Sequence, residues 1–234
     1  MNNLRLGYGS EWHLLRYMGR HRALLREKVL ALTGGDDLGW QDFGFTADAR
    51  EEGNFGDAES KGLDFLPAHP MHQDVREAWA KWWPQTGNVQ NWDAVGVVDR
   101  DGNPEWILVE AKANLEELKS ETKAKEHGGL PKIRDCFQEA QQAFGADAGR
   151  DWTKPYYQYA NRLAVLHFLT KMKVRARLLF IYFTGDSVPN RTCPKSAEEW
   201  QPALRDMKAS LGLKGDSPLE QLKHELFLPV LGDE

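Results

Sequence analysis

The sequence has 234 residues, of which 41% are hydrophobic and 11% aromatic, so it can bury the core of a full α/β domain, and a disordered chain is excluded. Its net charge of −5 is segregated: residues 36–110 carry an excess of eleven acidic side chains, and residues 111–180 an excess of five basic ones. This excludes a protein that coats nucleic acid tightly and non-specifically, but not an enzyme that contacts phosphates through a basic stripe.

The cysteines and the apolar runs bear on the cellular compartment. Cys136 and Cys193 lie far apart, without Cys-x-x-Cys or Cys-x-x-His spacing, so neither a disulfide framework nor a structural zinc site is expected. The longest apolar run, around 178–183, is too short to cross a bilayer, and the N-terminus lacks a basic-then-apolar signal pattern. We therefore expect a cytoplasmic protein without a membrane partner.

The N-terminal part of the chain predicts two helices around an irregular segment. The first helix spans 10–32, with Ser10 as its N-cap and Gly34 as its stop. An acidic, glycine-rich insertion follows over about 36–68, interrupted by a short aromatic strand from Trp40 to Phe45. The second helix runs from Pro70 to Trp83 and ends before a proline.

A β-hairpin is the next element and the strongest local signal in the sequence. Two β-type runs, 92–99 and 105–112, flank the dipeptide Asp101-Gly102, which is typical of a type I′ turn. In that turn Asp93 faces Glu110 as a non-hydrogen-bonded pair, with β-carbons about 4.5 to 5.5 Å apart.

Lys112 would project from the same face of the strand as Glu110. A type I turn with a bulge at Gly102 would instead shift the pairing by one residue and place the carboxylates of Asp93 and Glu110 on opposite faces.

The C-terminal half predicts more helices and one buried strand. Prolines open two of the helices, and the strand is apolar at every position. The expected helices span 115–126, 131–144, 155–173, 197–211 and 219–227, and the strand spans 178–183. Since no repeat or low-complexity linker interrupts the chain, we expect a single domain over 1–234, with a C-terminal helical extension around 196–234.

The hairpin also predicts chemistry. Two carboxylates and an ammonium beside apolar strand residues carry a desolvation cost that a bound cation would offset. Mg²⁺ or Mn²⁺ suits oxygen ligands, and the backbone carbonyl of Ala111 could add to the carboxylates of Asp93 and Glu110.

The Glu-x-Lys triplet by itself is weak evidence, because it recurs at 117–119 and 121–123 in a stretch that is typical of a solvated face. The plain alternative for 110–112 is an exposed strand end with an incidental ion pair. Glu110 is distinguished by its place at the end of the apolar run 106–109 and by its pairing with Asp93.

A helix with an acid, a strand beginning with Asp and a strand ending in Glu-x-Lys together resemble the PD-(D/E)XK nuclease superfamily. The matching segments are Ser10-Glu11-Trp12-His13, Asn91-Trp92-Asp93-Ala94-Val95-Gly96 and Val109-Glu110-Ala111-Lys112. The chain departs from the pattern by having Trp92 where proline is usual, and by the insertion, which makes the first strand hard to place. The resemblance implies a restriction-endonuclease-like α/β fold, a central mixed β-sheet flanked by helices.

The resemblance also implies roles for individual residues. Asp93 and Glu110 would hold the metal, Lys112 would orient or activate the attacking water, and Glu11 on the first helix would assist. Glu11 is also predicted on the buried stripe of that helix, where an unpaired carboxylate is penalised. The alternative is that an acid in the first turn only favours the helix dipole.

Other polar residues are candidate contacts to water or to the nucleic-acid backbone. Gln158 resembles a polar position on the helix that follows the Glu-x-Lys strand, and Arg162 lies one turn later; the alternative is the wet side of a core helix. Arg16 and Arg20 belong to a basic face of the first helix, and 171–177 is a second basic cluster; either could also be a solvated surface.

Two further observations bear on these candidates. His69 and His72 have ligand-like spacing, but without another partner nearby a zinc site is discounted. Most of the nine tryptophans are expected in the core, although some could stack on bases.

The sequence therefore favours a Mg²⁺- or Mn²⁺-dependent deoxyribonuclease that hydrolyses phosphodiester bonds in DNA, with a homodimer as an open question. A second hypothesis is a non-catalytic nucleic-acid-binding or assembly protein on the same fold. A third is a metal hydrolase acting on a small phosphoester.

Overall fold

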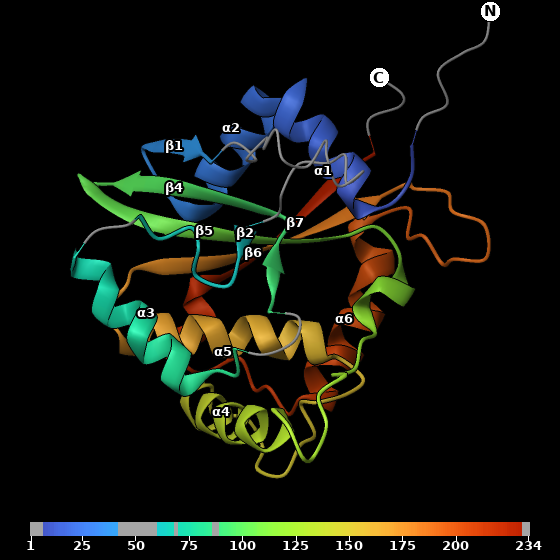
Figure 1. The fold of residues 1–234 in the computed structure, drawn as a ribbon. Helices are drawn as coiled ribbons and strands as arrows, with labels where there is room; N and C mark the ends of the chain where they lie inside the picture. The colour runs from blue at the N-terminus through green and yellow to red at the C-terminus, as the bar shows by residue number, and fades with distance from the viewer. Residues whose placement is uncertain (1–6, 42–59, 68–69, 86–88, 231–234) are drawn as a thin grey trace, which may run out of the picture.

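A five-stranded mixed sheet forms the centre of the computed structural model, which describes residues 7–41, 60–67, 70–85 and 89–230. The strand order is β1-β4-β5-β6-β7 (Figure 1); β1, β4 and β5 are antiparallel, and β5, β6 and β7 are parallel. The five strands are β1 Asp37–Trp40, β4 Ala94–Arg100, β5 Asn103–Lys112, β6 Ala176–Thr184 and β7 Lys223–Pro229. A short ladder beside the sheet pairs β2 (Ser60–Lys61) with β3 (Asn91–Trp92).

Helices cover both faces of the sheet (Figure 1). On one face lie α1 (Ser10–Gly19) and α2 (Arg22–Thr33). The other face carries α3 Pro70–Trp82, α4 Leu130–Ala143, α5 Tyr157–Lys171 and α6 Ala197–Ser210. Two 3₁₀ turns, η2 (Leu115–Leu118) and η3 (Pro218–Leu222), complete the described elements. The predicted α/β class, with a mixed central sheet flanked by helices, is thereby confirmed.

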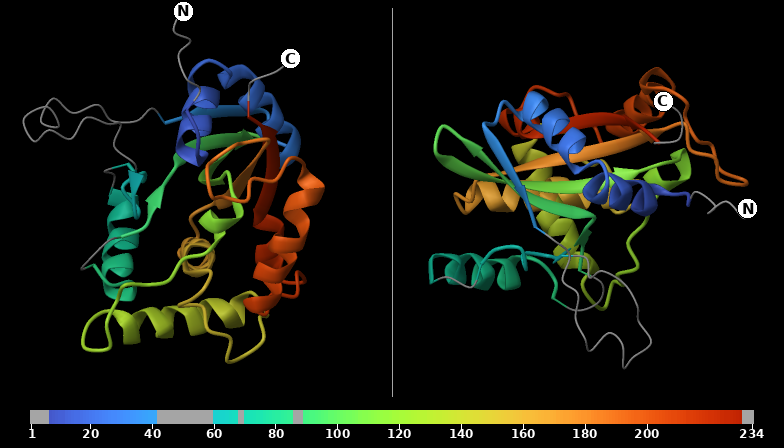
Figure 2. Two further views of the ribbon diagram at one scale, coloured as in Figure 1. Left: turned by 90° about the vertical axis from the view of Figure 1, so that its right-hand side faces the viewer. Right: turned by 90° about the horizontal axis from the view of Figure 1, so that it is seen from above.

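Helix α5 lies in the middle of the larger helical layer. Figure 2 shows it end-on, below the sheet and surrounded by α3, α4 and α6. Its residues from Tyr159 to Leu166 are all buried, as expected for a helix that is apolar on nearly every side. Polar side chains on α5 are therefore held inside the protein and need partners there.

The alternation of β5 decides which side chains face α5. Leu108 belongs to the core shared with α5, whereas Val109 and Ala111 belong to the core shared with α1 and α2. Because successive strand residues point to opposite faces, Glu110 and Lys112 project toward α5.

The predicted hairpin register is confirmed. Ala94 faces Val109 and Arg100 faces Asn103, which is the pairing expected for a two-residue turn at Asp101-Gly102. Both turn residues have positive φ, 53° and 74°, as a type I′ turn requires. Gly102 suits this position because it lacks a β-carbon.

The predicted first helix is wrong in one respect, since the structure has two helices rather than one. The chain turns at His21, whose φ of −115° and ψ of 29° are not helical, shortly after the weak helix former Gly19. The N-cap is Gly9 and not Ser10. The predicted stop is confirmed, because Gly34 ends α2 in the left-handed conformation.

The predicted helix over 115–126 is wrong beyond its first turn. Asn114 caps η2 by accepting from the Glu117 N–H, after which the chain runs extended. The N–H of Ser120 donates to the Pro155 carbonyl at 2.6 Å, and that of Thr122 to the Thr153 carbonyl at 3.0 Å. Hydrogen bonds to a distant segment thus replace those of the expected helix.

The predicted helix over 219–227 is also wrong. Residues 218–222 form η3, and 223–229 form β7, which pairs in parallel with β6. The edge of β6 offers backbone hydrogen bonds to this segment, and these outweigh its helix-like pattern. The local sequence does not show that such an edge is nearby. Of the helical extension expected around 196–234, α6 is therefore confirmed, and 223–229 instead complete the central sheet.

The remaining expectations divide between confirmed and undescribed segments. The helix from Pro70 is confirmed as α3. The strand expected at 40–45 overlaps β1 at Trp40 alone, since β1 spans Asp37–Trp40 and Gln41 is not in a strand; residues 42–45 lie outside the described residues. The insertion over 36–68 is described only at its ends. Among the described helices, none is long and apolar enough to cross a membrane. Both cysteines are free.

Candidate functional site

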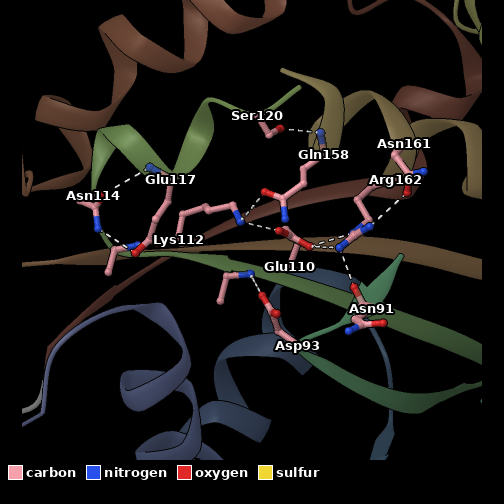
Figure 3. A network of polar contacts seen from close by, with 12 residues as sticks. Asn91, Asp93, Glu110, Lys112, Asn114, Glu117, Ser120, Gln158, Asn161 and Arg162 are labelled. Carbon is pink, nitrogen blue, oxygen red and sulfur yellow. Dashed lines mark hydrogen bonds and ion pairs between the residues drawn. The ribbon is translucent and has the colours of Figure 1, made fainter. Parts of the chain in front are cut away.

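Five polar side chains gather at the C-terminal end of β5 (Figure 3). Asp93 lies just before β4, Glu110 and Lys112 lie on β5, and Gln158 and Arg162 lie on α5. The hairpin brings the first three together, and α5 brings the other two across the buried face of the sheet. Four of the five are linked by hydrogen bonds or ion pairs among themselves.

Glu110 is at the centre of this network and is only 4% exposed. Its Oε1 is 2.5 Å from the Lys112 ammonium, and its Oε2 is 2.8 Å from Nε of Arg162. Burial by itself would raise the pKa of Glu110, but the charges of Arg162 and Lys112 more than offset it, so the pKa is lowered. Glu110 is therefore ionised and paired on both oxygens.

Lys112 bridges the strand and the helix. Its Nζ also donates to Oε1 of Gln158 at 3.2 Å, while the N–H of Gln158 donates to Ser120 Oγ at 2.8 Å. Burial lowers the pKa of Lys112, but Glu110 and Asp93 raise it by more, so the side chain stays a cation. Gln158 thus holds the ammonium from the helix side, at the place that the resemblance implied.

Asp93 sits where the β4–β5 ladder ends. Its N–H donates to the Val109 carbonyl at 3.1 Å, and its Oδ2 accepts from the Ala111 N–H at 2.6 Å. The predicted pairing of Asp93 with Glu110 is therefore wrong, because the ladder ends at Ala94 and Val109 and the Asp93 side chain takes the place of a backbone acceptor. Burial and the nearby Glu110 raise the pKa of Asp93 to about 7, although Lys112, the Ala111 N–H and Arg162 oppose the rise.

In metal-free buffer, Asp93→Asn is expected to stabilise the protein more as the pH rises. A folded-state pKa of about 7, above the usual 3.8, means that the stability tied to the proton is complete near pH 4 and is lost as the pH rises through 7. The amide avoids this loss, so its gain grows from little near pH 4 to about 2–4 kcal/mol near pH 8. Urea unfolding at several pH values measures it; a gain independent of pH would contradict the pKa assigned to Asp93.

The burial of Arg162 corrects its predicted role as a phosphate contact, and its charge bears on the predicted need for a metal. The side chain is 4% exposed and cannot act as the solvent-facing phosphate contact that was expected. Its NH2 donates to the Asn91 carbonyl at 2.5 Å, and its guanidinium lies 4.8 Å from the centre of the Trp92 ring. Since two cations balance two carboxylates here, the protein itself already meets part of the desolvation cost that was attributed to a missing metal.

The residues expected from the first helix are not brought to this site. Leu14 and Tyr17 of α1 pack against the face of the sheet opposite to Glu110. Glu11 is exposed and not on the buried stripe, which consists of His13, Leu14, Tyr17 and Met18. Arg16 is half-buried on α1, and Arg20 is exposed at its C-cap. Within the described residues, none of these three side chains forms a hydrogen bond or ion pair with Glu110 or Lys112.

His13 is the polar side chain that α1 buries instead. Its Nε2 lies 3.1 Å from a carboxylate oxygen of Asp186, and both side chains are 4% exposed. Asp186 also accepts from the Gly9 N–H at 2.9 Å. This pair ties the start of α1 to the turn after β6. The helical spacing of His13 with Tyr17 is the sequence signal that indicates its burial.

Tyr182 is a second residue that the sequence did not single out. It lies beside Lys112 in the parallel register of β5 and β6, and it lines a narrow cavity together with Glu110 and Gln158. It is 1% exposed, and its hydroxyl has no hydrogen-bond partner within the described parts of the chain. Only the alternation within the strand 178–183 could have placed it on the Glu110 side.

Tyr182→Phe is expected to raise the free energy of unfolding by about 1 kcal/mol, because it removes a buried hydroxyl without a partner and keeps the ring. The ring contacts with Trp200 and Phe227, at 5.0 and 5.5 Å between centres, are preserved. Chemical denaturation measures the change. A loss of stability would mean that the hydroxyl is hydrogen-bonded in solution.

The basic clusters and histidines are mostly engaged elsewhere. In the second cluster, Lys171 pairs with Glu139, and Nε of Arg177 lies 2.6 Å from Glu105. His72 contacts the Pro67 carbonyl, while His69 lies outside the described residues. Most tryptophans within the described ranges are buried, as expected: Trp40, Trp79, Trp83, Trp92, Trp152 and Trp200.

The donor set for a metal consists of few side chains. Within the described ranges, no group of three or more His, Cys, Asp or Glu side chains is assembled that could hold a metal ion. A metal at the end of β5 would rest on Asp93, Glu110 and main-chain oxygen. The role of the Ala111 carbonyl stays a prediction; its N–H is the group that contacts Asp93.

No protein-family model, curated protein or solved structure matches this chain.

Proposed function

We propose that this protein is a divalent-metal-dependent nuclease that hydrolyses phosphodiester bonds in DNA. The observation that carries the proposal is the convergence of Asp93, Glu110 and Lys112 from the two arms of one hairpin onto one end of the sheet, where Gln158 of α5 meets them. Two carboxylates beside one ammonium are the groups that metal-assisted phosphoryl transfer requires.

The chemistry of the donors suits Mg²⁺ or Mn²⁺. Asp93 and Glu110 offer hard oxygen ligands, and the raised pKa of Asp93 reflects a carboxylate whose charge lacks sufficient compensation. A bound metal would lower the pKa of its water and polarise the phosphoryl oxygen.

Glu110 must give up one of its two ion pairs to hold a cation. If it releases Lys112, the ammonium remains beside Gln158, in reach of an attacking water or of the phosphate. Arg162 then keeps Glu110 in place from the other side.

The sheet topology supports the finer fold proposal. An antiparallel hairpin that ends in Glu-x-Lys, followed by helices and a strand parallel to β5, is the order of elements that a restriction-endonuclease-like fold would have.

A specific observation favours a second candidate, a non-catalytic nucleic-acid-binding or assembly protein on the same fold. Both oxygens of Glu110 already have cationic partners, so the charge of this carboxylate is neutralised without a metal. A carboxylate that is fully paired within the protein is what a site that no longer binds a metal would show.

Cleavage of supercoiled and linear plasmid separates the two candidates. We expect the wild-type protein to cleave with Mg²⁺ or Mn²⁺ and to stop when EDTA removes the metal. Asp93→Ala serves as the matched inactive variant. Titration calorimetry with Mn²⁺ gives a second measure: absence of both cleavage and metal binding would reject the nuclease proposal and favour the binding protein.

A further inference from the structure

A pocket beside the site has the size of a small-molecule binding site. It lies between the end of α3, the start of α4, the N-terminus of α5 and the extended segment after η2, and it encloses about 570 Å³. Cavities of about 300–1,000 Å³ typically hold small ligands. We call it the α3–α5 pocket.

The α3–α5 pocket adjoins the candidate catalytic groups through Gln158. This side chain lines the pocket and also the narrow cavity that reaches Glu110. Its Oε1 accepts from Lys112 at 3.2 Å. A ligand in the pocket would therefore lie one side chain away from the site at which a phosphodiester would be cut.

The walls of the pocket combine flat apolar surface with polar edges. Pro84 and Tyr157 line it with partly exposed apolar surface, whereas Trp83 is only 2% exposed. Tyr157 is held by an edge contact with Phe137 at 5.9 Å. Ser120 to Lys123 supply hydroxyl and charged groups at the rim.

The main chain of the rim is already committed, since Ser120 and Thr122 donate their N–H groups to Pro155 and Thr153. The hydroxyls of Ser120 and Thr122 also have partners, the N–H groups of Gln158 and Ala124 at 2.8 and 3.2 Å. The rim is thus held in place, and the exposed side chains of Glu121 and Lys123 remain to meet a ligand. A planar ring with polar edges fits such walls, and a nucleobase is a ring of this kind.

We propose that the α3–α5 pocket receives the base of an unpaired nucleotide, so that the substrate of the nuclease is single-stranded DNA. This inference rests on the proposed function for the position of the phosphate. A base can enter such a pocket only if it is unstacked and unpaired, which costs several kcal/mol less in a single strand than in a duplex. The exposed Lys123 at the rim is suited to a neighbouring phosphate.

The test measures the binding of a fluorescent single-stranded oligonucleotide and of its blunt duplex, in EDTA to prevent cleavage. Ala124→Trp fills the pocket from its wall, and Tyr157→Leu removes an aromatic wall while keeping apolar volume. Ala31→Trp is the matched control, because Ala31 is exposed on α2. Circular dichroism confirms that each variant is folded.

We expect the wild type to prefer the single strand, and each pocket variant to weaken its binding about tenfold, the size of one lost base stack. The control should bind as the wild type does. Equal affinity for strand and duplex, or full affinity in both folded pocket variants, would overturn the inference. Cleavage is scored separately with Mg²⁺: binding without cleavage would reject the nuclease proposal and leave the pocket assignment standing.

Discussion

Replacing Lys112 by Met is expected to lower the rate of phosphodiester cleavage by about 10²- to 10⁴-fold, the usual contribution of a positioned proton-transfer or charge-stabilising group. The methionine keeps the apolar stem and removes the ammonium that contacts Glu110 and Gln158. Glu110 still has Arg162 as a partner, so the fold should survive. Single-turnover cleavage of DNA at saturating Mg²⁺ measures the chemical step.

The control uses the second Glu-x-Lys triplet of the chain. Lys119 belongs to the triplet 117–119, is exposed and lies outside the site, so Lys119→Met should leave the rate unchanged. If Lys112→Met cleaves as fast as the wild type while folded, Lys112 has no catalytic role. If both variants lose activity equally, the loss reflects surface charge and DNA binding instead of the chemistry at β5.

Replacing Arg162 by Met is expected to lower the free energy of unfolding by about 3–5 kcal/mol, because it leaves the buried carboxylate of Glu110 with only one cation. It also removes the contact with the Asn91 carbonyl, which ties β3 to α5. Urea unfolding followed by circular dichroism measures the loss. For a chain of this size the melting temperature should fall by at least about 6 °C.

A second substitution separates charge from packing. Adding Glu110→Gln to Arg162→Met should recover much of the loss, because the double variant no longer buries an under-compensated charge. Arg134→Met is the matched control: Arg134 pairs with Glu126 on the surface, where ion pairs contribute little. If Arg162→Met costs no more than Arg134→Met, the buried ion pair with Glu110 is not formed in solution.

Arg162 also connects stability to function. A metal that binds Glu110 competes with the cations that already hold it, so removing Arg162 should strengthen metal binding even as it weakens the fold. The same residue thus distinguishes the two candidate functions. In a non-catalytic protein, loss of Arg162 would affect stability alone.

The local part of the structure could be predicted from the sequence. The turn at Asp101-Gly102 requires two residues with positive φ, and this requirement sets the register of β4 and β5. That register places Ala94 opposite Val109 and so brings Asp93 next to the part of β5 that carries Glu110 and Lys112, but the hydrogen bond that the Asp93 side chain accepts from the Ala111 N–H was not part of the predicted pairing. Alternation and apolar run length likewise identified β6.

The partners of these residues depended on contacts between distant segments. Arg162 on α5 contacts Glu110 on β5 although the two residues are 52 positions apart, and no local sequence pattern predicts this pairing. The same holds for the edge of β6 that turns 223–229 into a strand, and for the hydrogen bonds that hold Ser120 extended. Tertiary hydrogen bonds outweigh helix propensity in both segments.

The sequence by itself determined the hairpin, its register and the carboxylates it brings together, because turn geometry and strand alternation act over a few residues. Only the tertiary structure decided what surrounds them. It placed α1, and with it Glu11, on the opposite face of the sheet, since the phase of an amphipathic helix is chosen by the core it buries. It also buried Arg162 and Gln158 against Glu110 and Lys112, because α5 is enclosed on nearly every side and its polar groups must find partners inside.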